Sequence, residues 1–106
     1  MPRRGVAAAA FAGALAGAGP SLAADEGKAL FTGGAVPACA ICHTLKDAGA
    51  TGAVGPVLDD LKPDAARVVS VLKTGVGAMP SYQATLTEAQ IQAIARYVST
   101  ASGGAK

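Results

Sequence analysis

The sequence has no tryptophan or asparagine, and it has few histidine, cysteine and aromatic residues. Its 106 residues include one histidine, two cysteines and four aromatic residues. A structural zinc site needs about four ligands, so two cysteines and one histidine fall one short within a single chain. A chain this short also buries a limited core. We therefore expect one domain whose core is completed by another large apolar body, and a polypeptide that is largely unfolded without it.

The sequence also lacks a strand pattern and a basic stripe. No alternation of apolar and polar residues with a period of two occurs, and there is no internal repeat. Nine Lys and Arg residues stand against seven Asp and Glu residues, and the balance becomes even if Arg3 and Arg4 are removed with a leader. Nucleic-acid binding needs a basic surface, which is missing. The sequence predicts an all-α protein that does not bind nucleic acid.

The first 24 residues have the organisation of an export signal. Arg3 and Arg4 provide a positive start, a run of apolar and small residues follows, and Ser21-Leu22-Ala23 resembles a signal-peptidase site. The apolar run is shorter than the roughly 20 residues that a membrane-spanning helix needs. We expect a cleaved signal peptide at residues 1–24, a mature domain at residues 25–106 without a membrane span, and location in the periplasm.

All cysteine and histidine of the chain lies in one stretch, Cys39-Ala40-Ile41-Cys42-His43. This C-x-x-C-H pattern is a known signature of c-type haem attachment. Residues three apart share one face of a helix, so Cys39 and Cys42 can each bond one vinyl group of a haem. His43 is then held beneath the ring, where its imidazole can bind the iron. The predicted cofactor is one covalently attached haem c with its iron.

The alternative interpretation of this stretch is a thiol–disulfide oxidoreductase that uses Cys39 and Cys42. That interpretation requires a βαβ context, and no alternation of strand and helix patterns surrounds the motif. A plain disulfide between the two cysteines would close a small loop, add little stability and leave His43 without a role.

Gly55-Pro56 has two interpretations from the residues alone. The pair can simply mark a turn. Alternatively, the carbonyl group of Pro56 can accept a hydrogen bond from the second nitrogen of His43, which would fix the imidazole tautomer and raise its basicity.

Met79 is the sole methionine after removal of the leader, and it lies 36 residues after His43. A thioether is a common axial ligand of haem iron, and it raises the reduction potential. The alternative role is that of a flexible side chain filling a gap in the core. With His43 and Met79 both bound, the iron would have no vacancy for oxygen, which favours an electron carrier over an enzyme such as a peroxidase or over a gas sensor.

Three helices are expected besides the haem-binding turn. The first covers residues 25–32 and is ended by Gly33. The second begins at Pro63 and is ended by Gly75. The third follows the capping box Thr87-Glu88-Ala89-Gln90, runs to about residue 100 and leaves a frayed tail. Irregular loops are expected between these helices.

The ordered motifs resemble those of small bacterial class I c-type cytochromes over nearly the whole mature chain. The motifs are Gly27-Lys28-Ala29-Leu30-Phe31, the C-x-x-C-H turn, Gly55-Pro56, Met79-Pro80, and a final helix with Ile94 and Tyr97. The resemblance implies the class I cytochrome c fold, with three to four helices around one haem and with the first and last helices crossing. It also implies that Pro56 supports His43 and that Met79 is the second axial ligand.

The segment from Cys42 to Ala50, continuing into Gly55-Pro56, is similar to cytochrome subunits that accept electrons from periplasmic molybdenum sulfite dehydrogenases. This resemblance implies a periplasmic carrier of single electrons, with a dehydrogenase as donor and a cytochrome or terminal oxidase as acceptor. The chain lacks the Asn and Trp residues that often bond the methionine sulfur or a haem propionate in the family. The candidate substitutes are Tyr82, Gln83, Lys46 and Arg67.

Overall fold

The computed structural model describes residues 20–105, which form a small helical domain. These residues form a succession of five α-helices, with a π-helical and a 3-10 turn and two short strands between them. The elements are α1 (Pro20–Ala29), η2 (Leu30–Gly34), α2 (Cys39–Cys42), β1 (Thr44–Leu45), η3 (Lys46–Ala48), β2 (Ala50–Thr51), α3 (Leu58–Leu61), α4 (Ala65–Thr74) and α5 (Glu88–Ser102). The prediction of an all-α protein is confirmed, and the two strands are its small exception.

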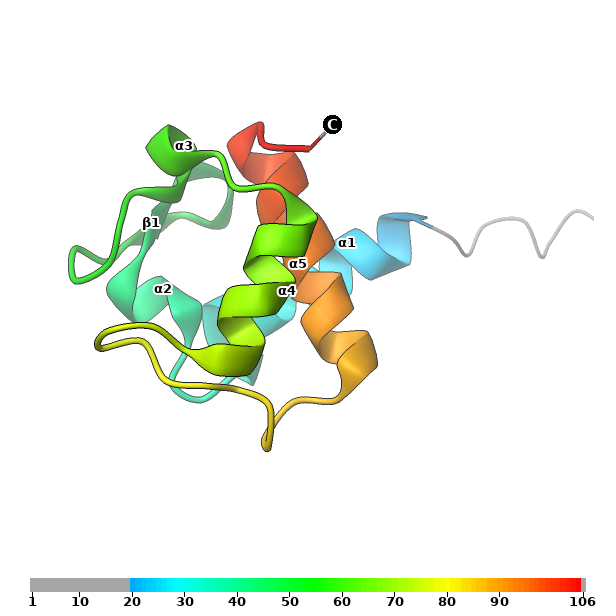
Figure 1. The fold of residues 1–106 in the computed structure, drawn as a ribbon. Coiled ribbons are helices and arrows are strands. Elements are labelled where there is room, and N and C mark those ends of the chain that lie inside the picture. Colours follow the sequence, from blue (N-terminus) through cyan, green and yellow to red (C-terminus); the bar gives the residue numbers. More distant parts are fainter. Residues whose placement is uncertain (1–19, 106) are drawn as a thin grey trace, which may run out of the picture.

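Helices α1 and α5 cross in close contact, as Figure 1 shows. Gly27 permits this approach, because a Cβ atom at that position would overlap the carbonyl oxygen of Ala93 and lie 2.5 Å from the Cβ atom of Tyr97. One turn later, the ring of Phe31 meets that of Tyr97 edge-to-face, with a centroid distance of 6.0 Å and an interplanar angle of 66°. The crossing implied by the class I resemblance is therefore present. Helix α4 also packs on α5.

The first helix differs from the prediction at both ends. It begins at Pro20, inside the predicted leader, and the remainder of that leader, residues 1–19, lies outside the described residues. Gly33 does not end it, because the chain continues through the wider turn η2. The N–H group of Ala35 donates to the carbonyl oxygen of Leu30 at 3.0 Å, a bond spanning five residues. This π-helical closure moves the end of the helix to Gly34.

The later helix boundaries are set by side-chain caps. Helix α4 begins two residues after the predicted start at Pro63, because Asp64 is the N-cap and accepts a hydrogen bond from the N–H group of Arg67 at 2.9 Å. The predicted capping box of α5 is confirmed. The N–H group of Gln90 donates to Oγ1 of Thr87 at 3.1 Å, and Oε1 of Gln90 accepts from the N–H group of Thr87 at 2.9 Å.

The loop expected between Thr44 and Pro56 contains a small hairpin that was not predicted. Strands β1 and β2 pair antiparallel, with Leu45 opposite Ala50. The single-turn helix α3 was also missed, because four residues are too few to show a helical period. The N–H group of Lys46 donates to a carboxylate oxygen of Asp59 at 2.9 Å, which ties the hairpin to α3.

The C-terminal tail is packed, so the prediction that it is frayed is wrong for the described residues up to 105. The N–H groups of Gly104 and Ala105 donate to the carbonyl oxygen of Ser99 at 2.8 and 2.9 Å. Gly104 is buried against the backbone of Lys62 and Pro63, with no room for a side chain. Separately, no helix within residues 20–105 is both long and apolar enough to cross a membrane.

Candidate haem site

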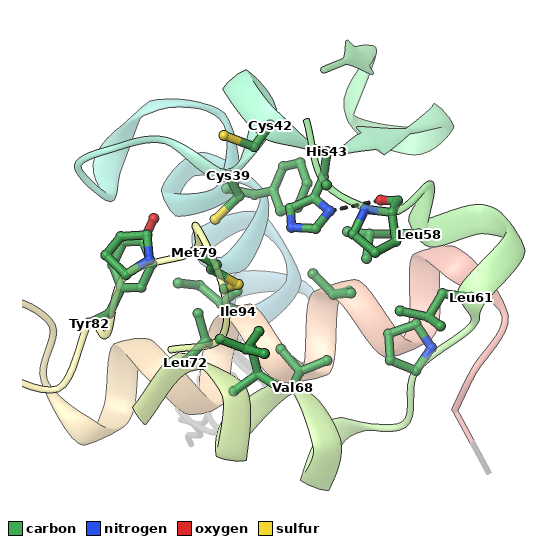
Figure 2. Close-up of a pocket in the computed structure, with 18 of the residues that line it drawn as sticks. Cys39, Cys42, His43, Leu58, Leu61, Val68, Leu72, Met79, Tyr82 and Ile94 are labelled. Atoms are coloured by element: carbon green, nitrogen blue, oxygen red, sulfur yellow. Dashed lines mark hydrogen bonds between the residues drawn. The ribbon is translucent and has the colours of Figure 1, made fainter. Parts of the chain in front are cut away.

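A largely apolar cavity of about 320 Å³ lies between the C-x-x-C-H turn, α4 and α5. Its volume is within the range of ordinary small-molecule sites, which is about 300 to 1,000 Å³. Most of the side chains that line the cavity are aliphatic. Of the lining residues, Arg67 alone is a Lys, Arg, Asp or Glu. Figure 2 shows this pocket, with the aliphatic side chains of Leu58, Leu61, Val68, Leu72 and Ile94 labelled around it.

Both cysteines border the cavity from one turn of helix. Helix α2 consists of Cys39–Cys42 alone, and the N–H group of His43 closes it with a 2.9 Å bond to the carbonyl oxygen of Cys39. Cys39 is buried and Cys42 half-buried, and no disulfide bond joins them. Burial raises the pKa of the Cys39 thiol to about 11. Within residues 20–105 no βαβ unit surrounds this turn, so the context that the thiol–disulfide oxidoreductase interpretation requires is missing.

The imidazole ring of His43 is fixed by Gly55-Pro56. Its Nδ1 atom donates to the carbonyl oxygen of Pro56 at 2.8 Å, the dashed line in Figure 2. Since Nδ1 carries the hydrogen, Nε2 retains the lone pair that a metal requires. The ring also lies against Gly55, where a Cβ atom would be 2.6 Å from Cε1 of His43. Of the two interpretations left open for Gly55-Pro56, this geometry matches the one in which Pro56 accepts a hydrogen bond.

Met79 enters the same cavity from the loop between α4 and α5. The N–H group of Val76 donates to the carbonyl oxygen of Met79 at 3.0 Å, and the reverse bond measures 2.9 Å, so residues 76–79 form a tight turn. Gly75 and Gly77 have φ values of 72° and 56°, which favour glycine. Figure 2 shows the side chains of Cys39, His43 and Met79 in one space. The structure therefore brings together all the site residues predicted from the sequence.

Of the four polar residues considered as family substitutes, only Tyr82 and Arg67 line the cavity. The hydroxyl group of Tyr82 donates to the carbonyl oxygen of Pro37 at 2.7 Å. Burial raises the pKa of Tyr82 above its ordinary value. The Tyr82–Pro37 bond joins residues 45 positions apart, and no sequence signal indicated it.

The donor set fits a haem. Residues 20–105 contain no cluster of three or more His, Cys, Asp or Glu side chains that could enclose a bare metal ion. The cavity instead combines two thiols, one imidazole with a free Nε2 atom and one thioether within an apolar wall. Such a wall suits a flat apolar ring. An iron held by a porphyrin still needs axial donors, and the imidazole and the thioether could supply two.

Comparisons with known proteins agree with this chemistry. A family model described as "Cytochrome C oxidase, cbb3-type, subunit III" matches residues 16–98. Among solved structures, the c-type cytochrome SorU from Sinorhizobium meliloti is similar, with a TM-score of 0.76 and 47% sequence identity over 82% of this chain and 99% of that chain. A search of curated proteins gave no match. The chain therefore belongs to the c-type cytochromes, has the class I fold of that family, and transfers electrons through covalently bound haem c.

Proposed function

We propose that His43 and Met79 are the two axial ligands of the haem iron. Cys39 and Cys42 form the thioether bonds, and Pro56 holds His43 in its ligating tautomer. The observation that carries this proposal is the 2.8 Å bond from Nδ1 of His43 to Pro56, which leaves Nε2 free on a ring that lines the same cavity as Met79.

These ligands favour a carrier of single electrons without catalytic residues. The haem supplies an iron that changes its charge by one. A neutral, soft thioether favours ferrous iron, so we expect a higher reduction potential than that of a bis-histidine site. With His43 and Met79 bound, the iron would have no free position for oxygen or peroxide. The polypeptide would keep His43 and Met79 in the same positions in the ferric and ferrous states.

Intact mass and absorption spectroscopy of the purified protein test the ligand assignment. We expect the polypeptide mass plus one haem, no thiol that reacts with alkylating reagents, and a ferric near-infrared band typical of methionine ligation. Two titratable thiols in a folded protein would contradict the roles of Cys39 and Cys42. A covalent haem without the methionine band would contradict the role of Met79 alone.

We further propose that the electron donor is a periplasmic molybdenum sulfite dehydrogenase. The similarity of residues 42–56 to cytochrome subunits of such enzymes supports this donor. The cavity is bordered by the exposed side chains of Val54, Leu61 and Val76, and the mature chain has equal numbers of acidic and basic residues. An apolar border on a chain with little net charge favours docking of the partner through short-range apolar contacts over long-range electrostatic steering. The match to a family described as an oxidase subunit supports a terminal oxidase or another cytochrome as acceptor.

Stopped-flow mixing tests the donor. Sulfite and a purified sulfite dehydrogenase should reduce the ferric protein rapidly, and Val54→Asp together with Val76→Asp should slow the reaction at least tenfold. The matched control is Val36→Asp, because Val36 is exposed but does not line the cavity. If the paired substitution left the rate of reduction unchanged, this docking surface would be wrong. If the dehydrogenase did not reduce the wild-type protein at all, this donor would be wrong.

The proposed location is the periplasm, after removal of residues 1–24. The positive start, the apolar run and Ser21-Leu22-Ala23 support this proposal. N-terminal sequencing of the protein from a periplasmic extract tests it, and we expect the chain to begin at Ala24 or Asp25. Recovery of the uncut chain with the membrane fraction would contradict it.

A further inference from the structure

The loop that carries Met79 has few attachments to the rest of the molecule. Val76, Ala78 and Pro80 are all exposed. At its end, the hydroxyl group of Ser81 donates to the carbonyl oxygen of Lys73 at 2.6 Å, and the N–H group of Tyr82 donates to that of Leu72 at 2.7 Å. Both bonds go to the last turns of α4, so they hold the loop to the helix before it.

The phenol of Tyr82 makes a different kind of attachment. It lies three residues after Met79 and is 3% exposed. Its hydroxyl group donates at 2.7 Å to the carbonyl oxygen of Pro37, two residues before Cys39. Within residues 20–105, no other hydrogen bond links residues 75–86 to residues 35–43. The phenol therefore connects the segment bearing Met79 to the segment entering the C-x-x-C-H turn.

We propose that Tyr82 is a positioning residue for Met79, acting as a latch that keeps the loop 75–86 closed over the cavity. This inference rests on the proposed ligation of iron by Met79. A phenol has one hydrogen to donate. Since that hydrogen is used at Pro37, Tyr82 acts through the backbone and is not the donor to the methionine sulfur. The position of Met79 then depends on the hydrogen bond from Tyr82 to Pro37.

Substitution Tyr82→Phe tests the latch, because it removes the hydroxyl group and leaves the carbonyl oxygen of Pro37 without this partner. The readout is loss of the near-infrared methionine band of the ferric protein as the pH is raised. We expect the equilibrium constant for methionine release to rise about tenfold, equivalent to about 1.4 kcal/mol. For release linked to one proton, the midpoint should fall by about one pH unit. Binding of added imidazole to the ferric protein should strengthen by the same factor.

Tyr97→Phe is the matched control. Tyr97 is also a buried phenol, 6% exposed, and it donates to the carboxylate of Asp47 at 2.6 Å outside the cavity. We expect this variant to lower resistance to denaturant while leaving methionine release unchanged. Equal release midpoints for Tyr82→Phe and the wild type would overturn the latch. Absence of the methionine band from the wild type would instead overturn the ligation by Met79.

A measurement on the unmodified protein covers the case in which Tyr82→Phe does not fold. The Tyr82 hydroxyl proton should be visible by NMR in the diamagnetic ferrous protein, exchange slowly with water and show nuclear Overhauser effects to Pro37. Rapid exchange with water, or effects to the Met79 methyl group without any to Pro37, would overturn the proposal.

Discussion

The Nδ1 atom of His43 lies 2.8 Å from the carbonyl oxygen of Pro56, and the face of the same imidazole ring lies against Gly55. Two consecutive residues thus determine both the tautomer and the position of the ring. Proline suits the first role, because its carbonyl oxygen is free to accept although it has no N–H group. Glycine suits the second, because only a residue without a Cβ atom leaves room for the imidazole.

Gly55→Ala should therefore displace the proposed proximal ligand. The added Cβ atom would lie 2.6 Å from Cε1 of His43 and 2.9 Å from Nδ1, so the ring or the backbone must move. We expect a loss of about 1–3 kcal/mol in the free energy of unfolding, as is typical of overpacked sites, together with a changed reduction potential. Denaturant titration and redox titration of the haem protein measure the two effects.

Gly33→Ala is the control for this substitution. A Cβ atom at Gly33 would meet nothing within 4 Å, and the backbone there does not have a positive φ. We expect wild-type potential and nearly wild-type stability. If Gly55→Ala behaved like Gly33→Ala, the packing of His43 against Gly55 would not restrain the ligand.

Met79→Ala should open the distal side of the haem. We expect the ferric protein to lose its methionine band, the reduction potential to fall, and the ferrous protein to bind carbon monoxide at neutral pH, which the wild type should not do. Val76→Ala is the control from the same turn, because its side chain is exposed. Carbon monoxide binding by the wild-type protein would contradict ligation by Met79 and favour a sensor or peroxidase.

Gly27→Ala should weaken the crossing of α1 and α5. Its Cβ atom would overlap the carbonyl oxygen of Ala93 and press on Tyr97, and neither the backbone nor a buried aromatic side chain can move freely. We expect the free energy of unfolding to fall by about 1–3 kcal/mol without a change in the absorption spectrum. Urea denaturation followed by circular dichroism measures this effect, and an unchanged midpoint would contradict the close approach.

The free energy of unfolding should fall above pH 10. Burial, together with the bond to Asp47, raises the pKa of Tyr97 above its ordinary value of 10. Below pH 10 the folded and unfolded chains both keep the phenol proton, so Tyr97 adds no pH dependence. Above pH 10 the unfolded chain loses the proton first and binds fewer protons, which favours unfolding by up to about 1.4 kcal/mol per pH unit.

Denaturant titrations from pH 7 to 11 measure this dependence, and Tyr97→Phe should remove part of the slope above pH 10. The Nζ atom of Lys28 lies 3.8 Å from Oδ2 of Asp47, the same carboxylate oxygen to which Tyr97 donates. Lys28→Gln is therefore the control variant, and it should retain the slope due to Tyr97. The same slope for Tyr97→Phe and the wild type would show that Tyr97 does not titrate with unfolding.

The sequence was informative where chemistry or local capping determines a feature. The C-x-x-C-H turn and the capping box at Thr87 each depend on side chains a few residues apart, and Met79 is the sole methionine after the predicted leader. The hairpin of β1 and β2, helix α3 and the folded-back tail were missed. Each is short and depends on distant partners, such as Asp59 for Lys46 or the Lys62–Pro63 backbone for Gly104.

The same distinction applies within the site. The residue types of the ligand set could be predicted, because few alternatives exist in this chain. The bond between Tyr82 and Pro37 could not, because it depends on the path of the chain between residues 45 positions apart. The end of the first helical segment was also not predictable, because the π-helical turn η2 extends it past Gly33 to Gly34.

An optical redox titration of the purified protein tests the central claim most directly. We predict a single reversible one-electron transition between low-spin ferric and ferrous haem spectra, with the methionine band present in the ferric form and the haem retained after denaturation. A colourless polypeptide that is compactly folded, with both Cys39 and Cys42 open to thiol reagents, would contradict the account.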